Sequence, residues 1–147
     1  MKVEIRIEPD AAEQKIIIVA DRLTPEIESL ARSLENRPVD RLPAHSEKGV
    51  EFLAPGQVLR IYSECQQIRV QTLSGSVLTL RGRLYEYEQQ LSGLRFARIS
   101  NSEIVNADMI TGMDFSLTGT ICLFLKGGIK TYVSRRYVSR IKKLFDV

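Results

Sequence analysis

The chain has very few of the residues that build metal sites, redox centres and disulfide frameworks. Its 147 residues include one histidine, two cysteines and no tryptophan. Cys65 and Cys122 lie 57 positions apart, so the sequence offers no closely spaced set of metal ligands. We therefore expect no metal and no cofactor. Two cysteines do not make a disulfide framework, and this favours a reducing, cytoplasmic location.

Long apolar runs are also missing. No stretch approaches the roughly 18 apolar residues that a membrane-spanning helix needs. The opening residues, MKVEIRIEP, alternate in polarity and contain no apolar core of a signal peptide. The length suits one domain with an appendage.

Catalytic motifs are absent as well. There is no nucleophile elbow, no Walker loop and no glycine-rich dinucleotide fingerprint. Gly127-Gly128 lies between two strand-like runs, so it is interpreted as a hairpin turn. Glu86 and Glu88 lie together on a predicted short helix, where a solvated face is the simpler explanation. We expect no catalytic residues and no enzyme activity.

The positive charge, in contrast, is concentrated in one part of the chain. Residues 1–45 hold seven basic and nine acidic side chains, and residues 46–94 hold five of each. Residues 95–147 hold nine basic and four acidic side chains, so the surplus lies in the last third. A local basic surface on a neutral body indicates a polyanionic partner, although a solvated basic helix face explains the charge equally well.

The N-terminal residues predict a small β-β-α unit. Residues 2–8 alternate in polarity and residues 15–20 are β-branched, so both are expected to be strands. Thr24 is placed to cap a helix over 25–36 whose apolar residues recur at helical spacing. Such a unit is too short to fold unaided, so its apolar face must dock on the rest of the chain or on another copy.

The next segment, residues 37–47, holds two prolines and the only histidine, and it is interpreted as a linker. His45 is expected to be solvated. We place an N-terminal extension with its linker at 1–45, serving dimerisation or signal input, and the main domain at 46–147.

The main domain is expected to be mainly β within an α+β chain. Its predicted elements are strands at 50–53 and 58–62, a hairpin of Ile68–Val70 and Val77–Leu80 around Ser74-Gly75, a helix over 83–91, strands at 109–115, 121–125 and 129–133, and a C-terminal helix capped by Ser134.

Arg135 and Arg136 open the predicted C-terminal helix. The first turn of a helix carries unpaired N–H groups and the positive end of the helix dipole, so basic residues there are unfavourable unless an anion is bound. The two arginines therefore indicate a phosphate ligand.

Polar connections form the second functional signal. Gln66 and Gln67 follow one predicted strand, and Asn101 lies in the polar stretch 100–103 between two apolar runs. Asn and Gln amides can pair with a base edge in the major groove, while arginines hold phosphates. Arginines flank these connections at positions 81, 83, 95 and 98.

Four blocks in order resemble the LytTR-type DNA-binding domain of bacterial transcription regulators. They cover about two-thirds of the chain, from about residue 48 to 145. The blocks are RIYSECQQIRVQT (60–72), LRGRLYEYEQQL (80–91), FARISNSEIVNADMI (96–110) and LKGGIKTYVSRRYVSRIKKL (125–144).

This resemblance implies packed small β-sheets with short helices, and loops rather than a recognition helix in the major groove. It implies DNA contacts at 64–67, at Asn101 with its neighbour Ser100, and at Arg136. Ser100 stands where the family often has His, and Glu103 where a larger residue is common. Only about 45 residues precede the domain, so we expect a stand-alone regulator without a receiver domain.

The sequence thus predicts a sequence-specific regulator that binds double-stranded DNA as a homodimer. Arg81, Arg83, Arg98 and Arg135 are assigned mainly to phosphates, and Gln66 or Gln67, Asn101 and Arg136 mainly to bases. The alternative is a protein-interaction module, such as an anti-regulator that binds a sensor or membrane protein. RNA binding is disfavoured because aromatic residues make up 7% of the chain.

Overall fold

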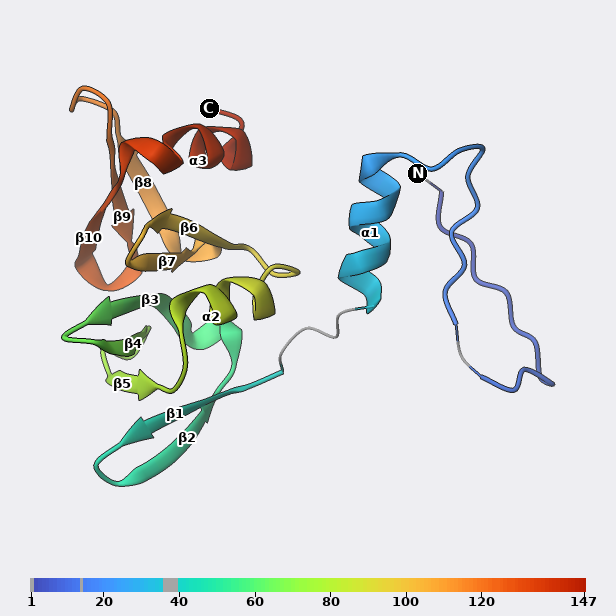
Figure 1. The fold of residues 1–147 in the computed structure, drawn as a ribbon, viewed down its shortest axis with the longest axis horizontal. Helices are drawn as coiled ribbons and strands as arrows, with labels where there is room; N and C mark the ends of the chain where they lie inside the picture. Colours follow the sequence, from blue (N-terminus) through green and yellow to red (C-terminus); the bar gives the residue numbers. More distant parts are fainter. Residues whose placement is uncertain (1, 14, 36–39) are drawn as a thin grey trace. The chain divides into compact units, whose positions relative to one another are not determined.

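A computed structural model describes residues 2–13, 15–35 and 40–147. The chain divides into two compact units, Met1–Glu35 and Asn36–Val147 (Figure 1). No helix of the described residues is long and apolar enough to cross a membrane.

The first unit contains one helix, α1 (Pro25–Glu35). The backbone N–H of Ile27 donates to Thr24 Oγ1 at 3.3 Å, as an N-cap requires. The predicted helix and its cap are confirmed, and Asn36, the last residue of the predicted range, lies outside the described residues.

The two strands predicted before this helix are wrong for the isolated chain. Residues 2–8 and 15–20 take part in no β-ladder. Their apolar side chains lie in solvent: Val3, Ile5 and Ile7 are 80–84% exposed, and Val19 is 91% exposed. Alternating polarity favours a strand, but a strand also needs a neighbour to accept its backbone hydrogen bonds, and these segments have none among the described residues.

The linker predicted over 37–47 is also corrected. Residues 37–39 lie outside the described residues, whereas Leu42–Ser46 forms strand β1. This strand pairs along its length with β2 (Gly49–Leu53) and at His45 with β5 (Val77–Leu80). Leu42 and Ala44 are fully buried, and their alternation was hidden by the neighbouring prolines. His45 is half-buried.

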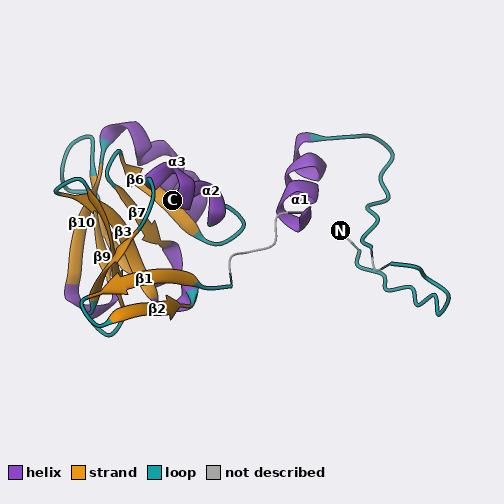
Figure 2. Ribbon diagram, turned by 60° about the horizontal axis from the view of Figure 1, so that its bottom comes forward, coloured by secondary structure: helices purple, strands orange, loops and turns teal. Residues whose placement is uncertain are grey.

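The second unit is built on two antiparallel sheets (Figure 2). The larger sheet has seven strands in the order β2-β1-β5-β4-β3-β7-β6, and the smaller has the order β10-β9-β8. The remaining strands are β3 (Val58–Glu64), β4 (Gln67–Thr72), β6 (Phe96–Ser100), β7 (Glu103–Asn106), β8 (Ile110–Asp114), β9 (Ile121–Leu125) and β10 (Ile129–Val133).

Two helices and two apolar clusters complete the unit. Helix α2 (Leu84–Gln90) lies over the first cluster, where Leu84 and Tyr87 pack with residues of β3, β4 and β5. Helix α3 (Val138–Phe145) belongs to the second, where Ile141 packs with residues of β6, β7, β9 and β10. The mainly β fold with short helices is confirmed.

Candidate nucleic-acid interface

Three polar turns meet at one edge of the second unit. They are the β3–β4 turn, the β6–β7 turn and the start of the segment after β10. The backbone N–H of Ser63 in β3 donates to the carbonyl of Ser102 at 2.8 Å, and that of Ser134 donates to the carbonyl of Ile99 at 2.8 Å. These bonds bring together the three segments that the sequence predicted to touch one ligand.

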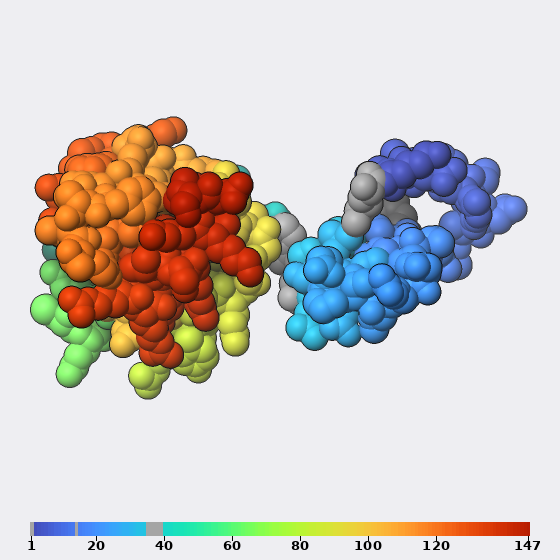
Figure 3. Space-filling model, turned by 90° about the horizontal axis from the view of Figure 1, so that it is seen from above, coloured from blue at the N-terminus to red at the C-terminus, as the bar shows by residue number. Residues whose placement is uncertain are grey.

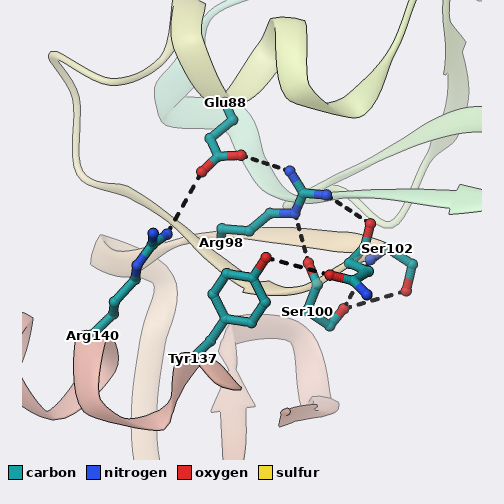
Figure 4. Close-up of polar contacts among 7 residues, drawn as sticks. Glu88, Arg98, Ser100, Ser102, Tyr137 and Arg140 are labelled. Carbon is teal, nitrogen blue, oxygen red and sulfur yellow. Dashed lines mark hydrogen bonds and ion pairs between the residues drawn. The ribbon is translucent and has the colours of Figure 1, made fainter. Parts of the chain in front are cut away.

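The polar stretch 100–103 contains the β6–β7 turn, and Arg98 holds this turn in place (Figure 4). Its Nε donates to the carbonyl of Ser100 at 2.6 Å, and its Nη2 donates to the carbonyl of Asn101 at 2.7 Å. Its Nη1 lies 2.6 Å from Glu88 Oε2 on α2. The Arg98 side chain is only 13% exposed. Its guanidinium therefore acts mainly inside the protein.

The turn presents Asn101 outward. Ser100 Oγ accepts from the backbone N–H of Ser102 at 3.2 Å, which closes the turn with a side chain. The Asn101 side chain is exposed, and its Oδ1 accepts from the Tyr137 hydroxyl at 3.4 Å (Figure 4). This long contact orients the amide while the group stays at the surface.

The β3–β4 turn has both central residues in the left-handed region. Cys65 has φ 50° and Gln66 has φ 64°, as a two-residue type I′ hairpin requires. Gln66 and Gln67 are both exposed. Neither central residue is glycine, so the backbone of the turn is strained, and both tip positions carry a side chain.

Arg81 and Arg83 follow β5 at the end of the sheet where the β3–β4 turn lies. Leu80, the last residue of β5, lies opposite Ile68, which follows Gln67 in β4. Both arginines are exposed. The carbonyl of Arg81 accepts from the Tyr87 hydroxyl, which fixes the backbone between the strand and α2.

Arg135 and Arg136 lie in a 3-10 turn, Arg135–Tyr137, and α3 begins only at Val138. The prediction that they occupy the first turn of the α-helix is therefore corrected, and Ser134 makes no side-chain cap. Both arginines are exposed, on the C-terminal segment that forms part of the surface in Figure 3 (red).

Tyr137 lies between basic groups. The guanidinium carbons of Arg136 and Arg140 lie 5.8 and 5.4 Å from its ring centroid. Arg140 Nη1 also lies 3.9 Å from Glu88 Oε1. Tyr137 is itself buried, with 8% of the residue exposed, whereas Glu88 was expected on a solvated face. The Tyr137–Asn101 and Glu88–Arg98 contacts could not be predicted from sequence spacing, because the partners lie 36 and 10 positions apart.

Glu103, beside the β6–β7 turn, is mostly buried and paired with a basic residue. Its Oε1 lies 3.5 Å from Arg60 Nη1 and its side chain is 13% exposed. Its Oε2 has no hydrogen-bond partner among the described residues. Burial raises the pKa of the Glu103 carboxyl above its ordinary value, and the nearby Thr131 hydroxyl and Arg60 guanidinium act in the opposite direction. An acidic residue next to the turn is thus compatible with an anionic ligand.

Comparisons with known proteins agree with this geometry. A model of the LytTr DNA-binding domain family matches residues 48–146. A protein of Staphylococcus aureus strain NCTC 8325 / PS 47, named as an uncharacterized HTH-type transcriptional regulator, is 29% identical over 148 residues; the match covers 100% of this chain and 99% of that protein. A protein of the same name from strain MRSA252 is 28% identical with the same coverage. A solved LytTr DNA-binding domain from Bacillus cereus has a TM-score of 0.70 at 22% identity, covering 74% of this chain and 99% of that one.

The helices of this chain differ from those of a helix-turn-helix protein. In a helix-turn-helix motif, two helices joined by a short turn place the second in the major groove. Here strands β1–β5 separate α1 from α2, and strands β6–β10 separate α2 from α3. Among the described residues, no two α-helices are joined by a short turn, and the candidate surface consists of two turns between strands and the 3-10 turn that follows β10.

Proposed function

Because this chain belongs to the LytTr DNA-binding domain family, whose model matches residues 48–146, we propose that it is a sequence-specific DNA-binding regulator of transcription. The observation that carries the proposal is the convergence of the β3–β4 turn, the β6–β7 turn and the Arg135–Tyr137 segment at one edge. The relatives named as transcriptional regulators support the same class of function.

In this proposal the turns enter the major groove of double-stranded DNA. Asn101, Arg136 and one of Gln66 and Gln67 contact base edges, since amides and guanidinium groups can form paired hydrogen bonds there. Arg81, Arg83 and Arg135 are exposed at the rim and bind phosphates. Arg98 serves this surface by holding the turn that carries Asn101.

A selection from random duplex DNA, performed with the purified chain at two salt concentrations, tests the proposal. We expect an enriched motif whose binding weakens steeply as salt rises, because phosphate contacts release counterions. Two copies acting together would enrich paired half-sites at a fixed spacing. No enrichment, with binding insensitive to salt, would overturn the proposal and favour a protein-interaction module.

Two substitutions test the assignment of the base-reading residues. We expect Asn101→Ala and Arg136→Ala each to weaken binding to the selected motif by about 1–3 kcal/mol. Lys126→Ala is the matched control, because Lys126 is exposed at the opposite end of β10 from Arg136. Fluorescence anisotropy with labelled duplex measures all three. Wild-type affinity in both site variants would show that the assignment is wrong.

A further inference from the structure

The first unit leaves its apolar side chains exposed. Residues 2–8 carry Val3, Ile5 and Ile7 on one face of an alternating segment, and all three lie in solvent. The segment ends at a turn, where the backbone N–H of Ala11 donates to the carbonyl of Glu8 at 3.1 Å. It is therefore a short strand sequence of defined length without a β-ladder.

The charges of this segment alternate in sign as well as position. Lys2, Glu4, Arg6 and Glu8 are all exposed and share the face opposite the apolar one. If two copies of the segment pair antiparallel about a two-fold axis at Ile5, Lys2 faces Glu8 and Glu4 faces Arg6. Opposite charges directly across an antiparallel pair stabilise it, and like charges destabilise it.

We propose that residues 2–8 pair with the same residues of a second copy of this chain, antiparallel and centred on Ile5. In this register every charged side chain faces the opposite charge, and Val3 faces Ile7 on the apolar side. The arrangement is self-complementary, as a two-fold interface requires. It also supplies the backbone partner that the strand sequence lacks in a single chain.

Charge selects this register over its neighbours. Moving the axis by one residue to Glu4 or Arg6 places that residue opposite its own copy and brings like charges together. If the axis instead falls midway between two residues, apolar side chains lie opposite charged ones. Parallel pairing in register sets every charge against itself.

If the second copy covers all the exposed aliphatic side chains of the first unit, the buried area reaches that of a stable interface. Beyond residues 2–8, the unit exposes Ile16, Ile17, Val19, Leu23 and Leu34. Burying eight aliphatic side chains removes on the order of 100 Å² of apolar surface each. The total is roughly the 800 Å² per partner of a standard interface.

Charge reversal in the full chain tests the proposal without DNA, so its outcome is independent of the proposed function. The dimer dissociation constant is measured by analytical ultracentrifugation for the wild type, Glu4→Arg, Arg6→Glu and an equimolar mixture of the two variants. Each variant alone places like charges at both symmetry-related pairs, and we expect its dimer to weaken about tenfold or more.

The mixture restores the opposite charges. The Glu4→Arg chain is basic at both positions 4 and 6, and the Arg6→Glu chain is acidic at both. When one copy of each pairs in the proposed register, position 4 of either chain again faces the opposite charge at position 6 of the other. A heterodimer should therefore form with wild-type affinity.

Lys48→Glu is the matched control, since it reverses an exposed charge in the second unit, outside the proposed interface, and should leave the dimer unchanged. A wild-type chain that stays monomeric to about 0.2 mM, a dimer indifferent to both reversals, or a mixture that fails to restore it would each overturn the proposal. Circular dichroism of each variant verifies that the second unit is folded.

Discussion

Arg98 lies beside the candidate DNA surface, and its contacts are made chiefly within the protein. Its three donors hold two carbonyls of the β6–β7 turn and one carboxylate of α2. The sequence analysis assigned Arg98 mainly to a phosphate. The sequence does not show where a guanidinium points, so these contacts within the protein could not be predicted. DNA contact by Arg98 stays a prediction, and the geometry supports a positioning role.

This role predicts a loss of stability for Arg98→Ala. The free energy of unfolding should fall by about 2 kcal/mol, since hydrogen bonds to charged groups in a mostly buried setting are lost. Urea denaturation measures the change. Arg95→Ala is the control, because its ion pair with Asp108 is 56% and 59% exposed and should contribute less than about 1 kcal/mol. Equal losses in both variants would contradict the positioning role.

Glu103 predicts a pH dependence. Because burial raises its folded-state pKa above the ordinary 4.5, the folded state binds this proton more tightly than the unfolded state. The resulting stabilisation is complete below pH 4.5 and is lost as pH rises through the folded-state pKa. Glu103→Gln removes this titration, so the variant should gain stability relative to wild type between about pH 4 and 8. Denaturation curves across that range measure it, and parallel profiles would refute the prediction.

At the scale of elements, the β3–β4 turn holds a candidate base-reading residue in a strained backbone conformation. Gln66 at φ 64° occupies a conformation that costs a non-glycine residue about 1–2 kcal/mol. Gln66→Gly should therefore raise the free energy of unfolding by about 1 kcal/mol. If Gln66 reads a base, the same variant should bind the selected DNA motif more weakly.

Cys65→Asn is the control for this turn. Asn tolerates the left-handed region better than most residues, so it relieves strain at position 65 and leaves Gln66 in place. We expect DNA affinity to fall less in this variant than in Gln66→Gly, with both measured by fluorescence anisotropy. A Gln66→Gly variant with wild-type affinity would leave Gln67 as the base-reading candidate.

The elements also show what the sequence could predict. Strands β2, β3, β4, β5, β8, β9 and β10 were predicted from short apolar runs or apolar alternation bounded by turn residues, and Thr24 and Pro25 marked the start of α1. Strands β6 and β7 were not identified as a pair, although their apolar runs flanked the polar turn. Strand β1 was not predicted, because the two prolines of residues 37–47 indicated a linker. The candidate site residues were chosen by residue type and their roles stay predictions, whereas the contacts of Glu88 and Tyr137 near Asn101 arise only in the fold.

At the scale of the whole molecule, the two units differ in charge and in completeness. The surplus of positive charge falls in residues 95–147, which include the β6–β7 turn and Arg136, whereas the first unit holds five basic and eight acidic side chains, a net charge of −3. The two apolar clusters of the second unit contain no residue of Met1–Glu35. The second unit thus has its own core and the candidate DNA surface, while the first has a segment whose apolar side chains are exposed.

This division predicts the effect of deleting residues 1–35. The remaining chain should keep its thermal unfolding transition and its affinity for a single half-site, because its core and turns are intact. If two copies pair through residues 2–8 as proposed, the dimer binds the second of two paired half-sites as an intramolecular event, which typically strengthens binding about 100-fold or more. The deletion should lose that gain, and titrations on single and paired half-sites measure it directly. If the shortened chain still binds paired sites as tightly as the full chain, the second unit dimerises by itself and the first unit has another role.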